Sequence, residues 1–296
     1  MDNKDITRRG FIMAGTAAAG FALAARPIGA ETILTPADGL TAGWISFAAA
    51  DGPVKAYRAR PAAPGRAPVV LVAHEIFGVH EYIQDVCRRL ARAGYLAIAP
   101  DLFQRQGDVS VLGSIPEIIE QVVNKVPDAQ VFADLDAAAA WADSSGEGDI
   151  GRLAITGFCW GGRFAWVYSA HNPGVRAAAA WYGRLLATGP GVLTDIGEGR
   201  TYPLSVADKL HGPVLGLYGG KDGSIPQDTI RQMREALAAA KDPSEIVVYP
   251  DATHGFHADY RAALYDEAAA RDGWQRMLDW FARYAGGKQA NTAFLL

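Results

Sequence analysis

The sequence predicts an α/β fold in which a mostly parallel sheet is covered by helices on both faces. Three observations support this prediction. Short β-rich segments alternate with helical patterns from Trp44 onward, residues 68–73 form an unbroken apolar run, and no linker or internal repeat divides the chain. Such alternation is typical of parallel sheets, and a strand buried on both faces is apolar throughout.

Each predicted element follows from a local pattern. The first two strands flank the turn Asp51-Gly52-Pro53 and are expected to pair antiparallel. Gly94 is expected to end one helix as its C-cap, and Asp128 to cap the start of another. The expected strands are residues 44–47, 54–60, 68–73, 95–99, 153–156, 177–181, 214–218 and 246–249, and the expected helices are residues 83–93, 116–125, 128–142, 163–170, 227–240 and 261–284. Residues 185–201 are rich in glycine and lack a pattern, so we expect a surface excursion near the functional site.

Composition excludes several classes of protein. Half of the 296 residues are hydrophobic, 20% are charged and the formal net charge is −4, as expected for a soluble globular protein. The two cysteines, Cys87 and Cys159, are too few for a disulfide scaffold. No basic stripe is present that would indicate a nucleic-acid partner, and no pattern indicates a cofactor.

Residues 1–30 indicate an export signal that precedes the folded domain. Paired Arg8 and Arg9 are followed by Phe11 and a weakly apolar stretch of mostly Ala and Gly. This pattern resembles a twin-arginine signal. The stretch would span only about 22 Å as a helix, short of the ~30 Å hydrocarbon core of a membrane. We therefore expect cleavage after Ala30, export by the twin-arginine machinery and a periplasmic protein of one domain, residues 31–296, without stable membrane anchoring. An uncleaved anchor and a cytoplasmic protein are the alternatives.

The segment from Gly157 to Gly162, GFCWGG, carries the strongest functional signal. A predicted strand runs into it and a predicted helix leaves it, as in a nucleophile elbow with cysteine in place of serine. Glycines are needed on both sides of the nucleophile because the turn is too tight for side chains there. A helix N-terminus also favours the thiolate of Cys159. The alternative is a structural cysteine in a turn made by glycines.

Two further groups follow Cys159 in the order that the α/β-hydrolase fold requires: nucleophile, acid, base. Asp222 comes just after a predicted strand, and His254 lies in the loop after the next one. Catalytic groups of open α/β sheets gather at the carboxyl ends of the strands. His254 is therefore predicted to take the thiol proton or to hold the thiolate as an ion pair, and Asp222 to fix the imidazole tautomer.

An oxyanion hole for this nucleophile needs two backbone N–H donors. One is the N–H of Trp160, directly after the nucleophile. The other is expected in the loop His74-Glu75-Ile76-Phe77-Gly78 after the apolar strand, where we choose Ile76.

These residues resemble the dienelactone hydrolase (carboxymethylenebutenolidase) family. The resemblance covers nearly all of the chain after residue 30 and is carried by HEIFGV (74–79), APDLFQRQ (99–106), GFCWGG (157–162), WYG (181–183), GGKD (219–222) and HGF (254–256). It implies an α/β-hydrolase that opens an enol-lactone to a keto acid through an acyl-cysteine. It also implies that Glu75 takes the proton of a neutral thiol when substrate binds, that Arg105 pairs a substrate carboxylate, and that Phe77 and Tyr182 line the pocket.

The sequence departs from the family pattern at one position. The family carries a second carboxylate-binding arginine four residues after the histidine, where this chain has Ala258. Arg261 is the residue that could replace it if the loop curls back. The alternatives are a general carboxylesterase or thioesterase with the same triad, and a ligand-binding scaffold without catalysis. No metal site is expected, since His254 and His257 lack a third ligand in register.

Overall fold

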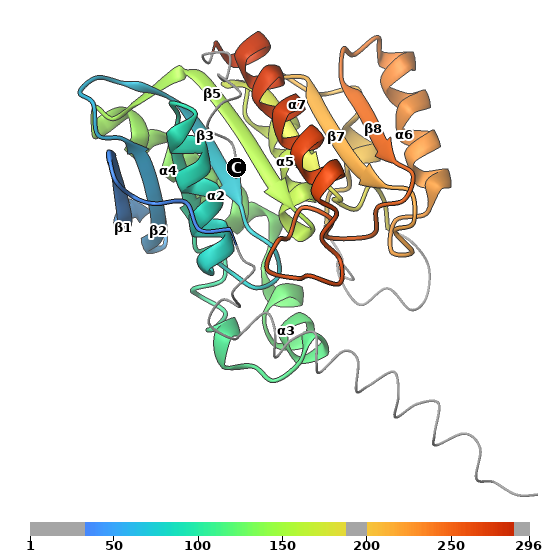
Figure 1. Ribbon diagram of the computed structural model, residues 1–296, viewed down its shortest axis with the longest axis horizontal. Helices are drawn as coiled ribbons and strands as arrows, with labels where there is room; N and C mark the ends of the chain where they lie inside the picture. The colour runs from blue at the N-terminus through green and yellow to red at the C-terminus, as the bar shows by residue number, and fades with distance from the viewer. Residues whose placement is uncertain (1–32, 188–199, 287–296) are drawn as a thin grey trace, which may run out of the picture.

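The computed structural model describes residues 33–187 and 200–286. In these residues eight strands form one sheet, in the order β1-β2-β4-β3-β5-β6-β7-β8 (Figure 1). The pairs β1–β2 and β2–β4 are antiparallel, and the remaining pairs are parallel. The predicted α/β architecture, including the antiparallel opening strands, is confirmed.

The elements match the predicted ones closely in position. The strands are β1 (Leu40–Ala49), β2 (Gly52–Pro61), β3 (Ala67–Ala73), β4 (Leu96–Pro100), β5 (Gly148–Phe158), β6 (Val175–Trp181), β7 (Val214–Gly219) and β8 (Glu245–Tyr249). The helices are α2 (Glu81–Arg92), α3 (Ile115–Gln121), α4 (Asp128–Ser144), α5 (Trp160–His171), α6 (Gln227–Ala240) and α7 (Glu267–Ala285), with short 3₁₀ turns η1 (Val109–Val111), η2 (Val123–Lys125) and η3 (Pro203–Val206).

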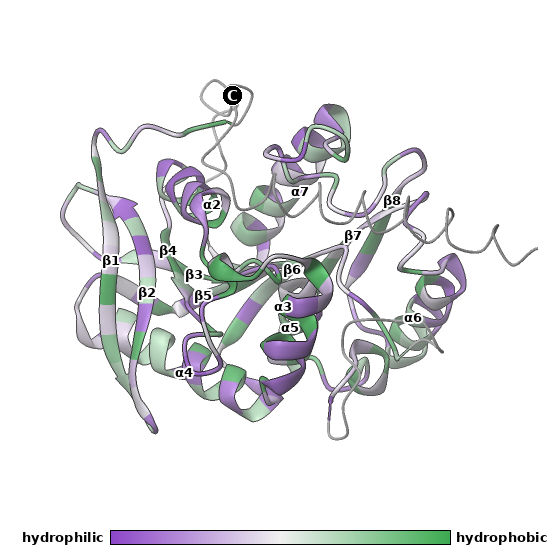
Figure 2. Cartoon of the chain, turned by 90° about the horizontal axis from the view of Figure 1, so that it is seen from below, coloured by the Kyte–Doolittle hydropathy of each residue, from purple (hydrophilic) through white to green (hydrophobic). Residues whose placement is uncertain are grey.

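Helices cover the sheet on both faces. α2 and α7 lie on one face, and α4, α5 and α6 lie on the other (Figures 1 and 2). In Figure 2 the hydrophobic residues are concentrated on the central strands and on the helix sides that face them. The central strand β3 is buried from Pro68 to Ala73, which explains its unbroken apolar run.

Two predicted helices differ from the observed ones. The last helix was expected from residue 261 but begins at Glu267, because the Asp266 carboxylate accepts a hydrogen bond from Ala269 N–H and so caps the helix there. The residues before it form turns, such as the one closed by Arg261 N–H on the Ala258 carbonyl. The helix expected over residues 116–125 is interrupted at Val122, whose φ and ψ of −124° and −67° separate α3 from η2.

Two predictions, one about the beginning of the chain and one about its middle, are not tested by the structure. Residues 1–30, the expected export signal, and most of the excursion expected over residues 185–201 lie outside the described residues. Among the helices that are described, none has the length and apolar composition needed to cross a membrane.

Asp128 forms a buried ion pair where a helix cap was expected. It is the first residue of α4, and Pro127 occupies the cap position. The Asp128 carboxylate accepts two hydrogen bonds, of 2.9 and 2.8 Å, from the Arg163 guanidinium of α5, and a third from Thr201 N–H at 2.8 Å. Arg163 is fully buried, and leaving its charge unpaired would cost more free energy than leaving the helix without a side-chain cap. The pair joins α4, α5 and residue 201.

We predict that Asp128→Asn lowers the free energy of unfolding by about 3 kcal/mol, because the charge of one member of a buried ion pair is removed. The matched control is Asp228→Asn, which breaks an exposed ion pair with Arg231 and should change the stability far less. Urea denaturation followed by circular dichroism measures both. Equal losses in the two variants would contradict the structural role of the buried pair.

Candidate active site

Cys159, His254 and Asp222 lie in one hydrogen-bonded row at the carboxyl ends of the parallel strands. Cys159 follows β5, Asp222 follows β7 and His254 follows β8. The His254 Nε2 atom lies 3.1 Å from Cys159 Sγ, and His254 Nδ1 lies 2.7 Å from Asp222 Oδ2. The sequence predicted that these residues lie close together, and the structure places them in contact. Their arrangement fits the predicted nucleophile, base and orienting acid.

The backbone of Cys159 adopts a strained conformation. Its φ of 55° and ψ of −114° lie where side chains are rarely found, directly between the end of β5 and the start of α5. The Cys159 N–H donates to the Trp181 carbonyl at the end of β6, at 3.0 Å. Strain of this kind persists only where the surroundings impose it, and here it presents the sulfur at the N-terminus of α5.

Close backbone contacts hold the turn in this conformation. A Cβ atom added to Gly157 would lie 2.0 Å from the Gly161 carbonyl oxygen, and one added to Gly161 would lie 2.1 Å from the Ala73 carbonyl oxygen. Both distances are far below a van der Waals contact, so neither position accepts a side chain without movement of the backbone. The predicted need for glycine on both sides of Cys159 therefore has a specific steric cause.

The triad is electrostatically arranged to keep a proton on His254. Burial opposes the imidazolium charge, but the negative charge of Cys159 and the hydrogen bonds with Asp222 and Cys159 outweigh it and raise the pKa of His254 to about 10. For Asp222, burial alone would raise the pKa, but the hydrogen bond and charge of His254 lower it. At neutral pH this arrangement favours the imidazolium form of His254 and the carboxylate form of Asp222.

Ser224 contacts both Asp222 and His254, and it was not predicted from the sequence. Its hydroxyl donates to Asp222 Oδ1 at 2.6 Å, its N–H donates to the same oxygen at 2.9 Å, and its Oγ lies 3.2 Å from His254 Nδ1. A serine two residues after an aspartate often makes such a turn, so the pattern Asp-x-Ser after β7 was the available signal. These bonds fix the orientation of the carboxylate.

The two predicted oxyanion donors are both buried and available. Ile76 and Trp160 are 6% and 3% exposed. Within residues 33–187 and 200–286, no acceptor is hydrogen-bonded to the backbone N–H of either residue. Trp160 N–H belongs to the first turn of α5, where N–H groups have no partner inside the helix.

Glu75 is held by groups other than the thiol. Its carboxylate accepts a hydrogen bond from Tyr260 Oη at 2.8 Å and lies 3.4 Å from His80 Nε2. Burial would raise its pKa, but the bond and charge of His80, the Tyr260 hydroxyl and the charge of Arg261 together lower it. The predicted role of Glu75 as acceptor of the thiol proton stays a prediction. The contribution of Tyr260 and His80 could not be read from spacing, because they come from the loop after β8 and the start of α2.

Tyr182, Phe77 and Arg261 lie around the triad and Glu75. The Tyr182 ring centroid is 5.1 Å from that of His254, and Tyr182 has an unusual positive φ of 39°. The Arg261 guanidinium carbon lies 5.8 Å from the Phe77 ring centroid. In the part of the chain that is described, the Arg261 side chain makes no hydrogen bond or ion pair. Its charge is thus available to an anion near Glu75.

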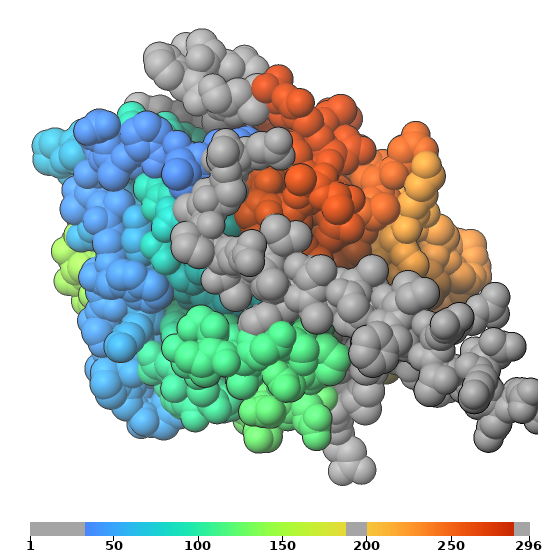
Figure 3. Space-filling model, turned by 60° about the horizontal axis from the view of Figure 1, so that its bottom comes forward, coloured from blue at the N-terminus to red at the C-terminus, as the bar shows by residue number. Residues whose placement is uncertain are grey.

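Arg105 forms ion pairs with two carboxylates of the protein itself. Its guanidinium binds Asp134 of α4 in a bidentate manner, at 2.8 and 2.9 Å, and also contacts Asp51 in the turn between β1 and β2. Figure 3 shows the green segment around α3, which follows Arg105, beside the blue hairpin of β1 and β2. These bonds favour a structural role for Arg105 and do not support the predicted pairing with a substrate carboxylate. Ala258 is completely buried, so the position of the missing family arginine is filled by the core.

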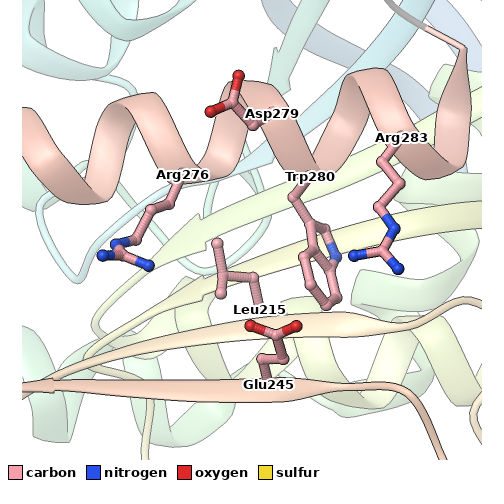
Figure 4. Close-up of a pocket in the computed structure, with 6 residues that line it drawn as sticks. All are labelled: Leu215, Glu245, Arg276, Asp279, Trp280 and Arg283. Atoms are coloured by element: carbon pink, nitrogen blue, oxygen red, sulfur yellow. The ribbon is translucent and has the colours of Figure 1, made fainter.

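No described residue suggests a metal site, because the structure brings together no group of three His, Cys, Asp or Glu side chains in the ranges it covers. A pocket of about 210 Å³ lies elsewhere, between α7 and the beginnings of β7 and β8 (Figure 4). It is therefore at the amino ends of the strands, opposite the loops that carry Cys159, Asp222 and His254. Its polar groups are largely paired, for example Arg276 with Asp272, and Trp280 Nε1 with the Pro213 carbonyl.

Comparison with known proteins identifies the family. The model of the Dienelactone hydrolase family matches residues 54–285. The chain belongs to this family. It is 53% identical over 274 residues to a protein named "Putative carboxymethylenebutenolidase" from Methylorubrum extorquens, covering 92% of both chains. It is 52% identical to a protein of the same name from Escherichia coli K12, covering 93% of this chain and 99% of that one.

A solved structure supports the same assignment. The crystal structure titled "Putative Dienelactone Hydrolase" from Klebsiella pneumoniae matches with a TM-score of 0.77 and 55% identity, over 83% of this chain and 99% of that one. The predicted α/β-hydrolase fold is confirmed. The prediction that this member of the dienelactone hydrolase family is a hydrolase acting on ester bonds is also confirmed.

We predict that Cys159→Ala lowers the pKa of His254 from about 10 towards its ordinary value, because the sulfur charge that opposes the burial effect is lost. The pKa is expected to fall because burial still disfavours the imidazolium in this variant, while Asp222 alone, without Cys159, still favours it. Nitrogen-15 NMR of the imidazole across pH 5–11 would measure the shift. The same titration midpoint in both proteins would show that the sulfur carries no charge in the resting enzyme.

Proposed function

We propose that this protein hydrolyses an enol-lactone or a small ester, with Cys159 as nucleophile and an acyl-cysteine as intermediate. The observation that carries the proposal is the row Cys159–His254–Asp222, with contacts of 3.1 and 2.7 Å beyond the carboxyl ends of β5, β7 and β8. The family match limits the reaction class to ester hydrolysis of the dienelactone hydrolase type. No cofactor or metal is needed for these steps.

In the acylation step, the thiolate attacks the carbonyl carbon of the substrate and the carbonyl oxygen becomes an oxyanion. The N–H groups of Ile76 and Trp160 stabilise it, each contributing about 3 kcal/mol in the transition state by analogy with known oxyanion donors. The intermediate then expels the ester oxygen, and the His254 imidazolium gives it a proton. In a lactone this leaving group stays attached to the acyl chain, and an enol product rearranges to the ketone.

In the deacylation step, neutral His254 takes a proton from water, and the resulting hydroxide attacks the thioester carbonyl. The second oxyanion collapses, the C–S bond breaks, and the sulfur leaves as the thiolate beside the newly protonated His254. The resting ion pair is thereby restored. We place the thiol proton on His254 in the free enzyme, because Sγ contacts its Nε2 while the Glu75 carboxylate is bound by Tyr260 and His80.

We predict that Cys159→Ala abolishes turnover and that Cys159→Ser leaves little, because the pair of charges that activates a thiol does not ionise an alcohol. The matched control is Cys87→Ala, which should keep its turnover, since Cys87 is fully buried in α2 and burial raises the pKa of its thiol. Hydrolysis of p-nitrophenyl acetate measures turnover, and mass spectrometry of the quenched reaction locates the acyl group. Wild-type turnover in folded Cys159→Ala would refute the proposal.

In this proposal, Arg261 is the residue that binds a negatively charged substrate. It is partly exposed, lies against Phe77, and forms no ion pair with a described residue, whereas Arg105 is bound by Asp134 and Asp51. A single guanidinium can form a charge-assisted bond worth about 1.5–3 kcal/mol with a carboxylate.

The second candidate function is a general carboxylesterase or thioesterase. The observation that favours it is the loss of carboxylate-binding groups: Ala258 is buried in place of the family arginine, and Arg105 is engaged in ion pairs. A site with one available arginine discriminates less strongly between anionic and neutral esters.

We predict that Arg261→Ala raises KM for an anionic lactone by roughly tenfold or more, the equivalent of about 1.5 kcal/mol, and hardly changes KM for a neutral ester of similar size. Arg105→Ala is the control: it should lower the melting temperature and affect both substrates equally. Steady-state kinetics with the two substrates decide between the arginines. A selective effect of Arg105→Ala, with none from Arg261→Ala, would restore the role first predicted for Arg105.

A further inference from the structure

We propose that His74 is the positioning residue of the oxyanion hole: its side chain fixes the peptide that carries the Ile76 N–H. This inference rests on the proposed function, since it concerns how that reaction's oxyanion is stabilised. The histidine was visible in the sequence as the first residue after β3, but it had no assigned role.

His74 occupies a fully enclosed position between two aromatic rings. It is 0% exposed. Its ring centroid is 4.6 Å from that of Phe103, in an edge contact, and 5.7 Å from that of Trp160, in a stacked contact with an interplanar angle of 21°. Trp160 supplies the other proposed oxyanion donor. The His74 ring therefore packs directly against one half of the hole.

The hydrogen bonds of His74 define its tautomer. The Leu102 N–H lies 3.1 Å from His74 Nε2, and because a backbone N–H can only donate, Nε2 must be the acceptor. The proton of the neutral ring is then on Nδ1, which donates to the Glu75 carbonyl oxygen at 2.7 Å. Burial, the largest influence, lowers the pKa of His74 and keeps the ring neutral, so this tautomer persists at neutral pH.

This bond controls the direction of the Ile76 N–H. The Glu75 carbonyl and the Ile76 N–H belong to the same peptide unit, and the described chain contains no cis peptide bond. In a planar trans peptide the C=O and N–H point in opposite directions. The Glu75 carbonyl is held by His74 Nδ1 and, more weakly, by Gly78 N–H at 3.3 Å. The N–H is thus directed away from both, where no described residue accepts it.

The experiment compares two amides that each keep one half of the imidazole's bonding. Asparagine can place its amide N–H where His74 Nδ1 donates, but it cannot reach Leu102. Glutamine can place its amide oxygen where Nε2 accepts, but it leaves the Glu75 carbonyl without its short bond. His74→Asn should therefore retain kcat for an ester within a few fold. His74→Gln should lower kcat on the order of tenfold to a hundredfold, because a donor displaced by about 1 Å can cost about 10²-fold.

Alkylation of Cys159 by iodoacetamide gives the control reaction. It needs the thiolate, forms a C–S bond and releases iodide, but it builds no oxyanion. The rate constant of inactivation should therefore change less than about threefold in His74→Gln, and KM for the ester should change little, while kcat falls. Thermal unfolding of each variant records its loss of stability.

Three results would overturn the inference. The first is an equal loss of kcat in the two variants. The second is a loss of kcat that follows the loss of melting temperature. The third is a matching loss in the alkylation rate. If wild-type protein hydrolyses no ester and resists iodoacetamide, the proposed function itself fails, and that outcome is distinct from the other three.

Discussion

The contact between Gly161 and the end of β3 is the constraint on which the rest of the site depends. The backbone of the nucleophile turn approaches the Ala73 carbonyl so closely that a Cβ atom on Gly161 would lie 2.1 Å from it. This contact allows the strained conformation of Cys159, and it places the first turn of α5 beside the loop that follows β3. The two proposed oxyanion donors, Ile76 and Trp160, therefore come from different elements, and backbone packing brings those elements together.

Ion pairs with buried carboxylates engage several arginines of the chain. Arg163 is bound by Asp128, Arg105 by Asp134, and Arg89 by Asp85 and Asp259. A buried charge without a partner is costly, and the carboxylates of these pairs are almost completely buried, so the fold holds these arginines in place. Arg261 differs because the turn before α7 leaves it partly exposed beside Phe77. The electrostatic character of the site thus follows from how the remaining arginines are paired.

Three histidines near the site show how environment separates their roles. His254 lies between Cys159 and Asp222, and its pKa is raised to about 10. His74 is buried between aromatic rings with its pKa lowered, and it acts as a neutral donor and acceptor. His257 is also buried; its Nδ1 lies 2.6 Å from the Tyr82 hydroxyl, and its pKa is well below the ordinary value. The partners of each imidazole therefore differ in a way that fits a proposed catalytic acid at His254, a proposed positioning residue at His74 and a core residue at His257.

The sequence by itself determined where the strands lie along the chain, the tight turn at Cys159 and the proximity of Cys159, Asp222 and His254. Each depends on a local pattern: an apolar run, glycines around Cys159, or polar residues just after strands. It could not decide the partners of charged residues. Asp128 was expected to cap a helix but pairs with Arg163, 35 positions away in the sequence. The pairing of Arg105 with Asp134, 29 positions away, was not expected either, and the role of Arg105 towards substrate stays a prediction. Only the tertiary structure sets those choices, because the cost of leaving a charge unpaired depends on which side chains burial brings within reach.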